Sequence, residues 1–113
     1  GIVGSSVTEE LARMFRLPVD AGVLVEKVVD GTAAARAGLK GGADSTVVAG
    51  ESYTLGGDVI VAVAGKRVSS LEELRDQLAG YKPGKTVGLE IYRGARSLQI
   101  DVKLGRQPTT PSG

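Results

Sequence analysis

Apolar residues along the chain fall into runs with two spacings, and each spacing predicts a different kind of element. Near-continuous apolar runs over 22–29 and 58–63 predict strands. The second run has no polar alternation, so we expect that strand to be buried on both faces. Alternating patterns over 87–93 and 97–104 predict two more strands, and Gly94 between them predicts a hairpin turn.

The clearest helical pattern spans 69–79, soon after the buried strand. Its leucines recur at three- and four-residue spacing, and two serines each stand three residues before a glutamate, which is the spacing of a capping box. The leucines are Leu71, Leu74 and Leu78. This order predicts a helix held beside a sheet, and a groove between a helix and a sheet can hold a peptide.

An opening strand and two shorter helices are also predicted. Residues 1–7 are apolar enough for a short strand, and Ser6-x-x-Glu9 has capping-box spacing, so a helix is expected to start near Ser6 to Thr8. Thr32 is expected to cap an alanine-rich helix over 33–37. Gly38 is expected to end that helix in the left-handed conformation, which glycine adopts at little cost.

The remaining segments complete the predicted domain. Between 40 and 55, glycines bound an irregular stretch that we expect to fold into a small hairpin. Residues 106–113 contain two prolines and no large apolar side chain, so a disordered tail is expected there. Hairpin pairing with dispersed helices favours one domain over 1–105, built as a partly open barrel capped by helices.

Composition excludes several function classes. The 113 residues include no histidine and no cysteine, which removes the usual general base, a cysteine nucleophile and thiolate zinc sites. The net charge is +1 with interspersed charges, and only four residues are aromatic, so no nucleic-acid partner is expected. No apolar run reaches the length of a membrane span. We expect no catalytic residue, no metal, no cofactor and no membrane insertion in this chain.

Isolated polar residues have structural explanations. Asp58 stands among glycines and is expected to form a turn. Ser5 and Ser6 have no base near them in the sequence and are expected to cap a helix. Arg93 and Arg96 flank the predicted hairpin turn, where exposed charge discourages edge-to-edge aggregation.

Several segments, read in order, resemble the PDZ domain of the type attached to bacterial HtrA/DegP-like serine proteases. They are Gly1-Ile2, Gly22-Val23-Leu24-Val25, Asp30-Gly31-Thr32-Ala33-Ala34, Ala37-Gly38-Leu39, Gly57-Asp58-Val59-Ile60, Gly65, the 71–78 helix and Lys82-Pro83-Gly84. The resemblance covers nearly all of 1–105. It implies an α+β, mainly β fold: a partly open barrel or sandwich of five to six strands capped by two to three helices.

The resemblance also has departures. The aromatic or leucine residue that usually precedes Gly1 is missing, so the carboxylate-binding loop is preserved only in part. The segment 44–56 is longer than the minimal pattern. The family's Gly-Asn-Ser-Gly-Gly protease motif is absent, so this chain would be the appended domain and not the enzyme.

In such domains a peptide C-terminus lies antiparallel to a strand, between that strand and a helix. The resemblance carries these roles to three sets of residues here. The carboxylate would meet Gly1 and Ile2, the pairing strand would include Val3, Gly4 and Ser5, and the groove helix would present Leu71, Arg75 and Leu78. Many PDZ domains carry histidine at the Leu71 position. Because leucine cannot bond a ligand hydroxyl, we expect apolar residues near the ligand C-terminus, and Arg75 favours an acidic residue upstream.

The expected partners are C-terminal or extended peptide segments and a protease domain of the same parent chain. The resemblance places that parent, a serine endopeptidase, in the bacterial cell envelope, in a periplasmic or extracytoplasmic location. An alternative stays open, in which the domain packs on a protease domain or on its own copies and regulates activity or oligomerisation with little peptide affinity.

Overall fold

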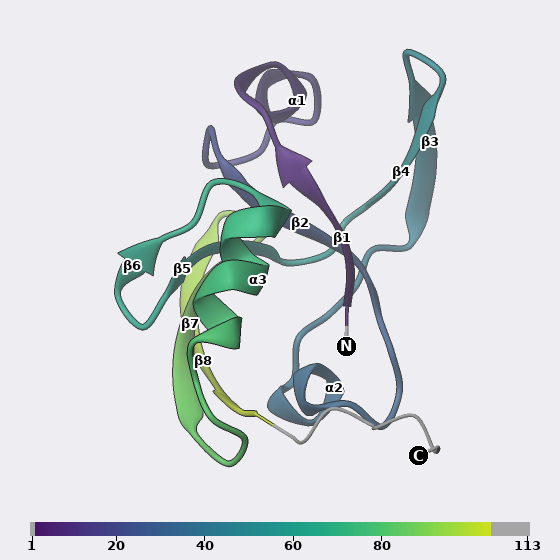
Figure 1. Cartoon of the computed structure of the whole chain (residues 1–113). Helices are drawn as coiled ribbons and strands as arrows, with labels where there is room; N and C mark the ends of the chain where they lie inside the picture. Colours follow the sequence, from purple (N-terminus) through teal and green to yellow (C-terminus); the bar gives the residue numbers. More distant parts are fainter. Residues whose placement is uncertain (1, 105–113) are drawn as a thin grey trace.

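The computed structural model of the chain describes residues 2–104. Within this range the backbone forms eight strands and three helices (Figure 1). They are β1 (Ile2–Val7), α1 (Glu9–Met14), β2 (Gly22–Val28), α2 (Ala33–Ala37), β3 (Asp44–Val48), β4 (Glu51–Leu55), β5 (Val59–Val63), β6 (Lys66–Arg67), α3 (Leu71–Ala79), β7 (Thr86–Arg93) and β8 (Arg96–Lys103). The predicted mainly β fold with helical caps is confirmed. Gly1 and the predicted tail lie outside the described residues.

Six strands form one antiparallel sheet in the order β1-β2-β5-β7-β8, with β6 paired to β5. The strand β1 therefore lies at one end of the sheet. Its ladder with β2 has an irregularity between Val3 and Gly4. The predicted hairpin at Gly94 joins β7 to β8.

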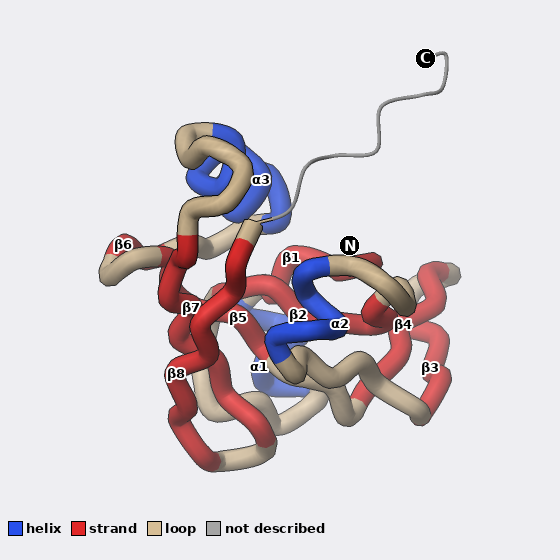
Figure 2. Tube along the Cα trace, turned by 90° about the horizontal axis from the view of Figure 1, so that it is seen from below, coloured by secondary structure: helices blue, strands red, loops and turns tan. Residues whose placement is uncertain are grey.

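The sheet has an apolar core on each side of its centre. Ile60 and Val63 of β5 belong to the larger core, beneath α2 and α3, whereas Val59 belongs to a smaller core with Ala12 of α1. Figure 2 shows α3 and α1 on opposite sides of β2 and β5. The predicted burial of β5 on both faces is thus confirmed, and each fully buried valine or isoleucine contributes roughly 1.5–3 kcal/mol of transfer free energy.

Side-chain hydroxyls begin all three helices. Thr8 accepts a hydrogen bond from the Leu11 amide at 3.1 Å, and Ser70 accepts one from the Glu73 amide at 3.1 Å. These bonds satisfy amides that have no partner within the helix. The prediction that Ser6 caps the first helix is wrong, because Ser6 lies in β1 and Thr8 is the cap.

The segment 40–55 does form a hairpin, which stands apart from the main sheet as a second, two-stranded sheet of β3 and β4 (Figure 1). Its two-residue turn has positive φ at both Ala49 (52°) and Gly50 (84°), as a type I′ turn requires. At its base, Gly57 passes so close to the Val25 carbonyl that a Cβ would not fit. Only glycine allows the hairpin to leave the sheet in this way.

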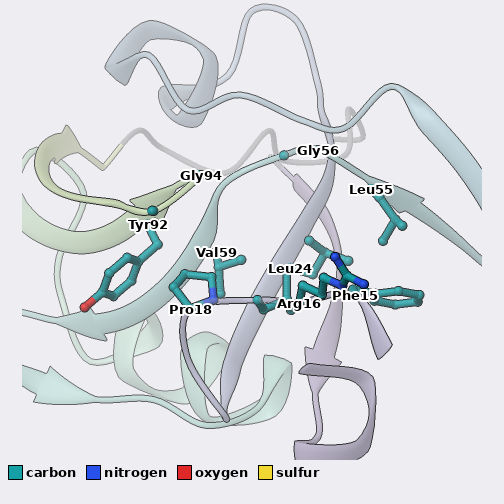
Figure 3. A pocket seen from close by; sticks show the side chains of 12 residues that line it. Phe15, Arg16, Pro18, Leu24, Leu55, Gly56, Val59, Tyr92 and Gly94 are labelled. Carbon is teal, nitrogen blue, oxygen red and sulfur yellow. The ribbon is translucent and has the colours of Figure 1, made fainter. Parts of the chain in front are cut away.

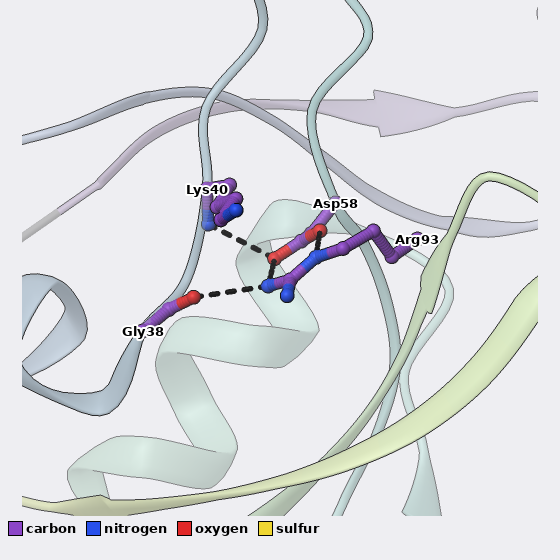
Figure 4. A network of polar contacts seen from close by, with 4 residues as sticks. All are labelled: Gly38, Lys40, Asp58 and Arg93. Atoms are coloured by element: carbon purple, nitrogen blue, oxygen red, sulfur yellow. Dashed lines mark hydrogen bonds and ion pairs between the residues drawn. The ribbon is translucent and has the colours of Figure 1, made fainter.

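The polar pair Asp58 and Arg93 corrects a further expectation. Asp58 is 1% exposed and accepts two hydrogen bonds from Arg93, each at 2.8 Å (Figure 4). Its carboxylate also accepts the Lys40 amide at 2.9 Å, and Arg93 donates to the Gly38 carbonyl at 2.9 Å. Asp58 is therefore more than a turn residue, and Arg93 is not a free surface charge. The hydrogen bond to Asp58 raises the pKa of Arg93, against a smaller opposing effect of burial.

Candidate functional site

A pocket of about 880 Å³ opens between β1 and α3. It brings together four residues of the sequence-predicted site: Ile2, Leu71, Arg75 and Leu78. Apolar side chains from the larger core and the neighbouring loops complete its lining. They are Ala33, Ala34, Leu39, Ile60, Leu74, Ala79, Tyr81, Pro83, Leu89, Val102 and Leu104.

One face of β1 is turned toward the pocket and α3. On this face, Ile2 lines the pocket, and the hydroxyl of Ser6 accepts a hydrogen bond from the Leu71 amide at 2.9 Å. That amide belongs to the first turn of α3, so Ser6 ties the helix to the strand. A Cβ on Gly4 would meet the Leu24 carbonyl at 3.0 Å and the Leu71 side chain at 3.7 Å. Because glycine has no side chain, β1 can lie close to β2 here, and the space between Gly4 and Leu71 stays open.

The outer edge of β1 has no strand partner within residues 2–104. The phase of its backbone follows from β2. The Val25 amide donates to the Asp58 carbonyl at 2.8 Å, away from β1, so its neighbour Leu24 directs its backbone groups toward β1. Ser5 lies opposite Leu24, and Gly4 therefore directs its N–H and C=O out of the sheet.

The side of α3 that faces the pocket forms a second wall, beside β1. Leu74 is 2% exposed and belongs to the core. Leu71 and Leu78 are half-buried at the pocket, and Arg75 is exposed at its rim. The helix thus presents two apolar side chains and one cation to the groove.

The wall opposite α3 was missed by sequence reasoning. The pocket is also lined by Ala33 and Ala34 of α2, by Tyr81 and Pro83 in the turn after α3, and by Leu104 after β8. The alanine-rich composition of α2 was the available signal, because small side chains on a helix leave room beside it. Neither the helix pattern nor the strand pattern indicates that α2 faces α3 across this space.

Glu26 joins the pairing strand to the hairpin and was also missed. One of its carboxylate oxygens accepts the Ser5 hydroxyl at 2.6 Å, and the other accepts the Thr54 amide at 2.7 Å. Ser5 is thus not a helix cap either.

Partial burial, followed by the charges of Glu51 and Glu26, raises the pKa of Tyr53 above its usual value.

A second pocket, of about 510 Å³, lies on the α1 side of the sheet (Figure 3). Phe15, Leu24 and Val59 contribute apolar surface to it, and Arg16 is its one charged lining residue. None of the sequence-predicted site residues lies in this pocket. The larger groove beside β1 is therefore the candidate site.

The chemistry of the groove is that of binding. Its lining includes one charged side chain, Arg75, and no pair of groups that could act as acid and base. No cluster of three acidic or metal-ligating residues occurs in the part of the chain that the structure describes. None of the helices between residues 2 and 104 combines the length and apolarity needed to cross a membrane.

Comparison with known proteins points to one family. The sequence model of the PDZ domain family matches residues 3–104. The periplasmic pH-dependent serine endoprotease DegQ of Escherichia coli K12 is 32% identical over 104 residues, which is 92% of this chain and 20% of DegQ. A probable periplasmic serine endoprotease, DegP-like, of Chlamydia trachomatis is 34% identical over 109 residues, which is 96% of this chain and 19% of the relative.

Solved structures show the same fold. The HtrA3 PDZ domain bound to a phage-derived ligand, FGRWV, matches with a TM-score of 0.66 and 23% identity, covering 91% of this chain and 80% of that domain. The HtrA-type protease AlgW with a decapeptide matches with a TM-score of 0.68 and 27% identity, covering 96% of this chain and 29% of that one. The chain spans about a fifth of the length of the curated relatives it matches.

Proposed function

Because the chain belongs to the PDZ domain family and is homologous to the corresponding domains of DegP/DegQ serine endoproteases, we propose that it binds C-terminal or extended apolar peptides in the groove between β1 and α3. The observation that carries the proposal is the free edge of β1 lying next to an apolar pocket. A peptide strand added to this edge would gain main-chain hydrogen bonds, whatever its sequence.

Each part of the groove has a role in this proposal. The outward backbone groups of Gly4 pair with the peptide, and those of Val3 and Ser5 stay in the ladder with β2. The carboxylate lies at the start of β1, where the Ile2 amide donates to it, because a buried anion without donors is very costly. The last ligand side chain enters the pocket between Ile2 and Leu78.

Arg75 and Leu71 set the preference further along the peptide. Leu71 offers no hydrogen-bonding group, so an apolar ligand residue is favoured beside it. Arg75 is exposed at the rim, where its charge attracts an acidic ligand residue upstream. The peptide-bound HtrA3 and AlgW structures, which share this fold, support a peptide as the ligand class.

A titration with one peptide in two forms tests the proposal. The peptide is a fluorescent, apolar decapeptide with a free C-terminal carboxylate, and its twin is amidated at that end. We expect the free acid to bind at least about tenfold more tightly, a difference of about 1.4 kcal/mol. Equal affinities would contradict the carboxylate role, and no binding of either form would favour the regulatory alternative.

Two lysine substitutions on α3 locate the binding site. Leu71→Lys puts a charge in the apolar groove and should weaken the free acid by about tenfold or more. The matched control is Glu72→Lys, one residue along the same helix, which is exposed and does not line the pocket. The affinity of the Glu72→Lys variant for the free-acid peptide should differ from that of the wild type by less than about threefold. Equal effects of the two substitutions would place the peptide elsewhere.

We further propose that the domain selects substrates for a serine endoprotease of the bacterial envelope. This part rests on the relatives, which are named as periplasmic proteases and of which the chain matches only a fifth. The segment preceding Gly1 in the full-length protein tests it. A protease domain with a nucleophilic serine is expected there, and an unrelated domain would contradict the proposal.

A further inference from the structure

The free edge of the hairpin strand β3 is a second surface that could pair with a strand. β3 pairs with β4 on one side only, and no strand lies on its other side among residues 2–104. Figure 1 shows the hairpin standing away from the main sheet. This surface is separate from the edge of β1 that the proposed function uses.

The phase of the hairpin ladder identifies the groups on this edge. The Thr54 amide points away from β3, because it donates to Glu26 at 2.7 Å. Ser45 lies opposite Thr54, so Ser45 also directs its backbone groups away from β4. Strand alternation then places the N–H and C=O of Val47 on the same free edge.

The edge has few of the features that usually prevent strand pairing. The β3–β4 register is continuous, with no bulge, and β3 contains no lysine, arginine or proline. The edge strand β8, in contrast, has Arg96 and Lys103 at its ends and packs against α2. Val47 is 66% exposed, the highest value among the exposed large hydrophobic residues of the described chain.

We propose that β3 pairs with β3 of a second copy of this chain, antiparallel and centred on Thr46. In this register Ser45 of each copy lies opposite Val47 of the other, so the outward backbone groups of both residues meet in reciprocal hydrogen bonds. The two hairpins then form one four-stranded sheet, which is more stable than a two-stranded ribbon alone. The pairing is isologous and closes at two copies.

The charge of Asp44 favours antiparallel over parallel pairing with the second copy. Asp44 is the one charged residue of β3. Antiparallel pairing about Thr46 places each Asp44 opposite Val48 of the other copy, at the two far ends of the ladder. Parallel pairing would put the two carboxylates side by side, which destabilises a sheet. The surface is small, so we expect weak association, with a Kd on the order of 100 μM.

Register-specific crosslinking tests the proposal. Because the chain contains no cysteine, only the introduced thiols can form a disulfide. In the full 113-residue chain, Thr46→Cys would bring two thiols opposite each other, with Cα atoms about 4.5 Å apart, within reach of a disulfide. Ser45→Cys is the matched control, because its diagonal separation of about 7–8 Å exceeds that reach. We expect Thr46→Cys to form the oxidised dimer at least about tenfold faster, and equal rates would overturn the proposal.

Sedimentation of cysteine-free chains provides an independent measurement. The wild-type chain should show a dimer fraction that rises with concentration up to about 1 mM. Val47→Pro removes an outward N–H without removing a β4 ladder bond, and should be monomeric. Should Val47→Pro unfold, Val47→Lys replaces it as an edge charge and should also be monomeric. A monomeric wild type, or variants that associate like the wild type, would overturn the proposal. Saturating groove peptide should leave the dimer fraction unchanged.

Discussion

Asp58 is the buried charged residue of the described chain, and three neighbouring groups satisfy it. The pair with Arg93 could not be read from the sequence, because the two residues are 35 positions apart. The register of β5 with β7 places Val59 opposite Tyr92, which brings the preceding Asp58 beside the following Arg93. Sequence patterns predicted both strands, but a pattern of apolar residues does not specify which strands pair or in which register.

Removal of Arg93 should destabilise the fold strongly. Arg93→Met leaves the Asp58 carboxylate buried with only the Lys40 amide as donor, and an unpaired buried charge costs about 3–5 kcal/mol. Because the Arg93 side chain is 35% exposed, water can replace it in part, so we expect about 3 kcal/mol in urea unfolding. The matched control Arg96→Met, on the same hairpin and exposed, should change stability by less than about 0.5 kcal/mol. Equal losses would contradict a structural role for the pair.

Charge reversal at Arg75 should reverse part of the ligand preference. In Arg75→Glu the rim of the groove becomes acidic, so a peptide with an upstream lysine should gain on a peptide with an upstream glutamate by about threefold to tenfold. Competition between the two peptides for the wild-type and variant domains measures this. An unchanged ratio would show that Arg75 does not face the ligand.

At the scale of elements, helix starts were predictable because capping depends on a few adjacent residues. Thr32 and Ser70 cap their helices as expected. The start of α1 falls within the predicted range, but the cap was assigned to Ser6 because Ser6 and Thr8 both offer a hydroxyl near the same turn. Ser6 is used instead by the amide of Leu71, 65 residues away, and this long-range contact leaves no local signal.

Glu26 should stabilise the hairpin through its two acceptor oxygens. Glu26→Gln removes the charge from the acceptor: its amide oxygen can still accept from the Thr54 amide and its N–H group can donate to the Ser5 hydroxyl, so two charge-assisted hydrogen bonds become neutral ones, at a cost of about 1 kcal/mol. Unfolding in urea measures the total loss, and amide exchange of Thr54 reports opening of the hairpin. The control Glu90→Gln, on an exposed strand position, should have little effect. If both variants lose equally, Glu26 is not the link.

At the scale of the whole molecule, two sheets of unequal size give an elongated shape of 41 × 30 × 21 Å. The groove forms where the free edge of β1 meets α3, and the apolar patterns of both elements were visible in the sequence. The wall from α2 and the 81–83 turn was not, because it depends on how three separate segments pack over one core. The parts of the site on β1 and α3 could therefore be predicted from local sequence patterns, but the wall contributed by segments distant in the sequence could not.

Amide exchange at Gly4 is the most direct measurement of strand addition at this edge. With saturating free-acid peptide, the outward N–H of Gly4 should exchange at least about tenfold more slowly, because it enters a new ladder. The outward amide of Ser45, on the other free edge, is the internal control and should not change. Peptide binding with unchanged exchange at Gly4, or equal slowing at Gly4 and Ser45, would contradict peptide pairing with β1.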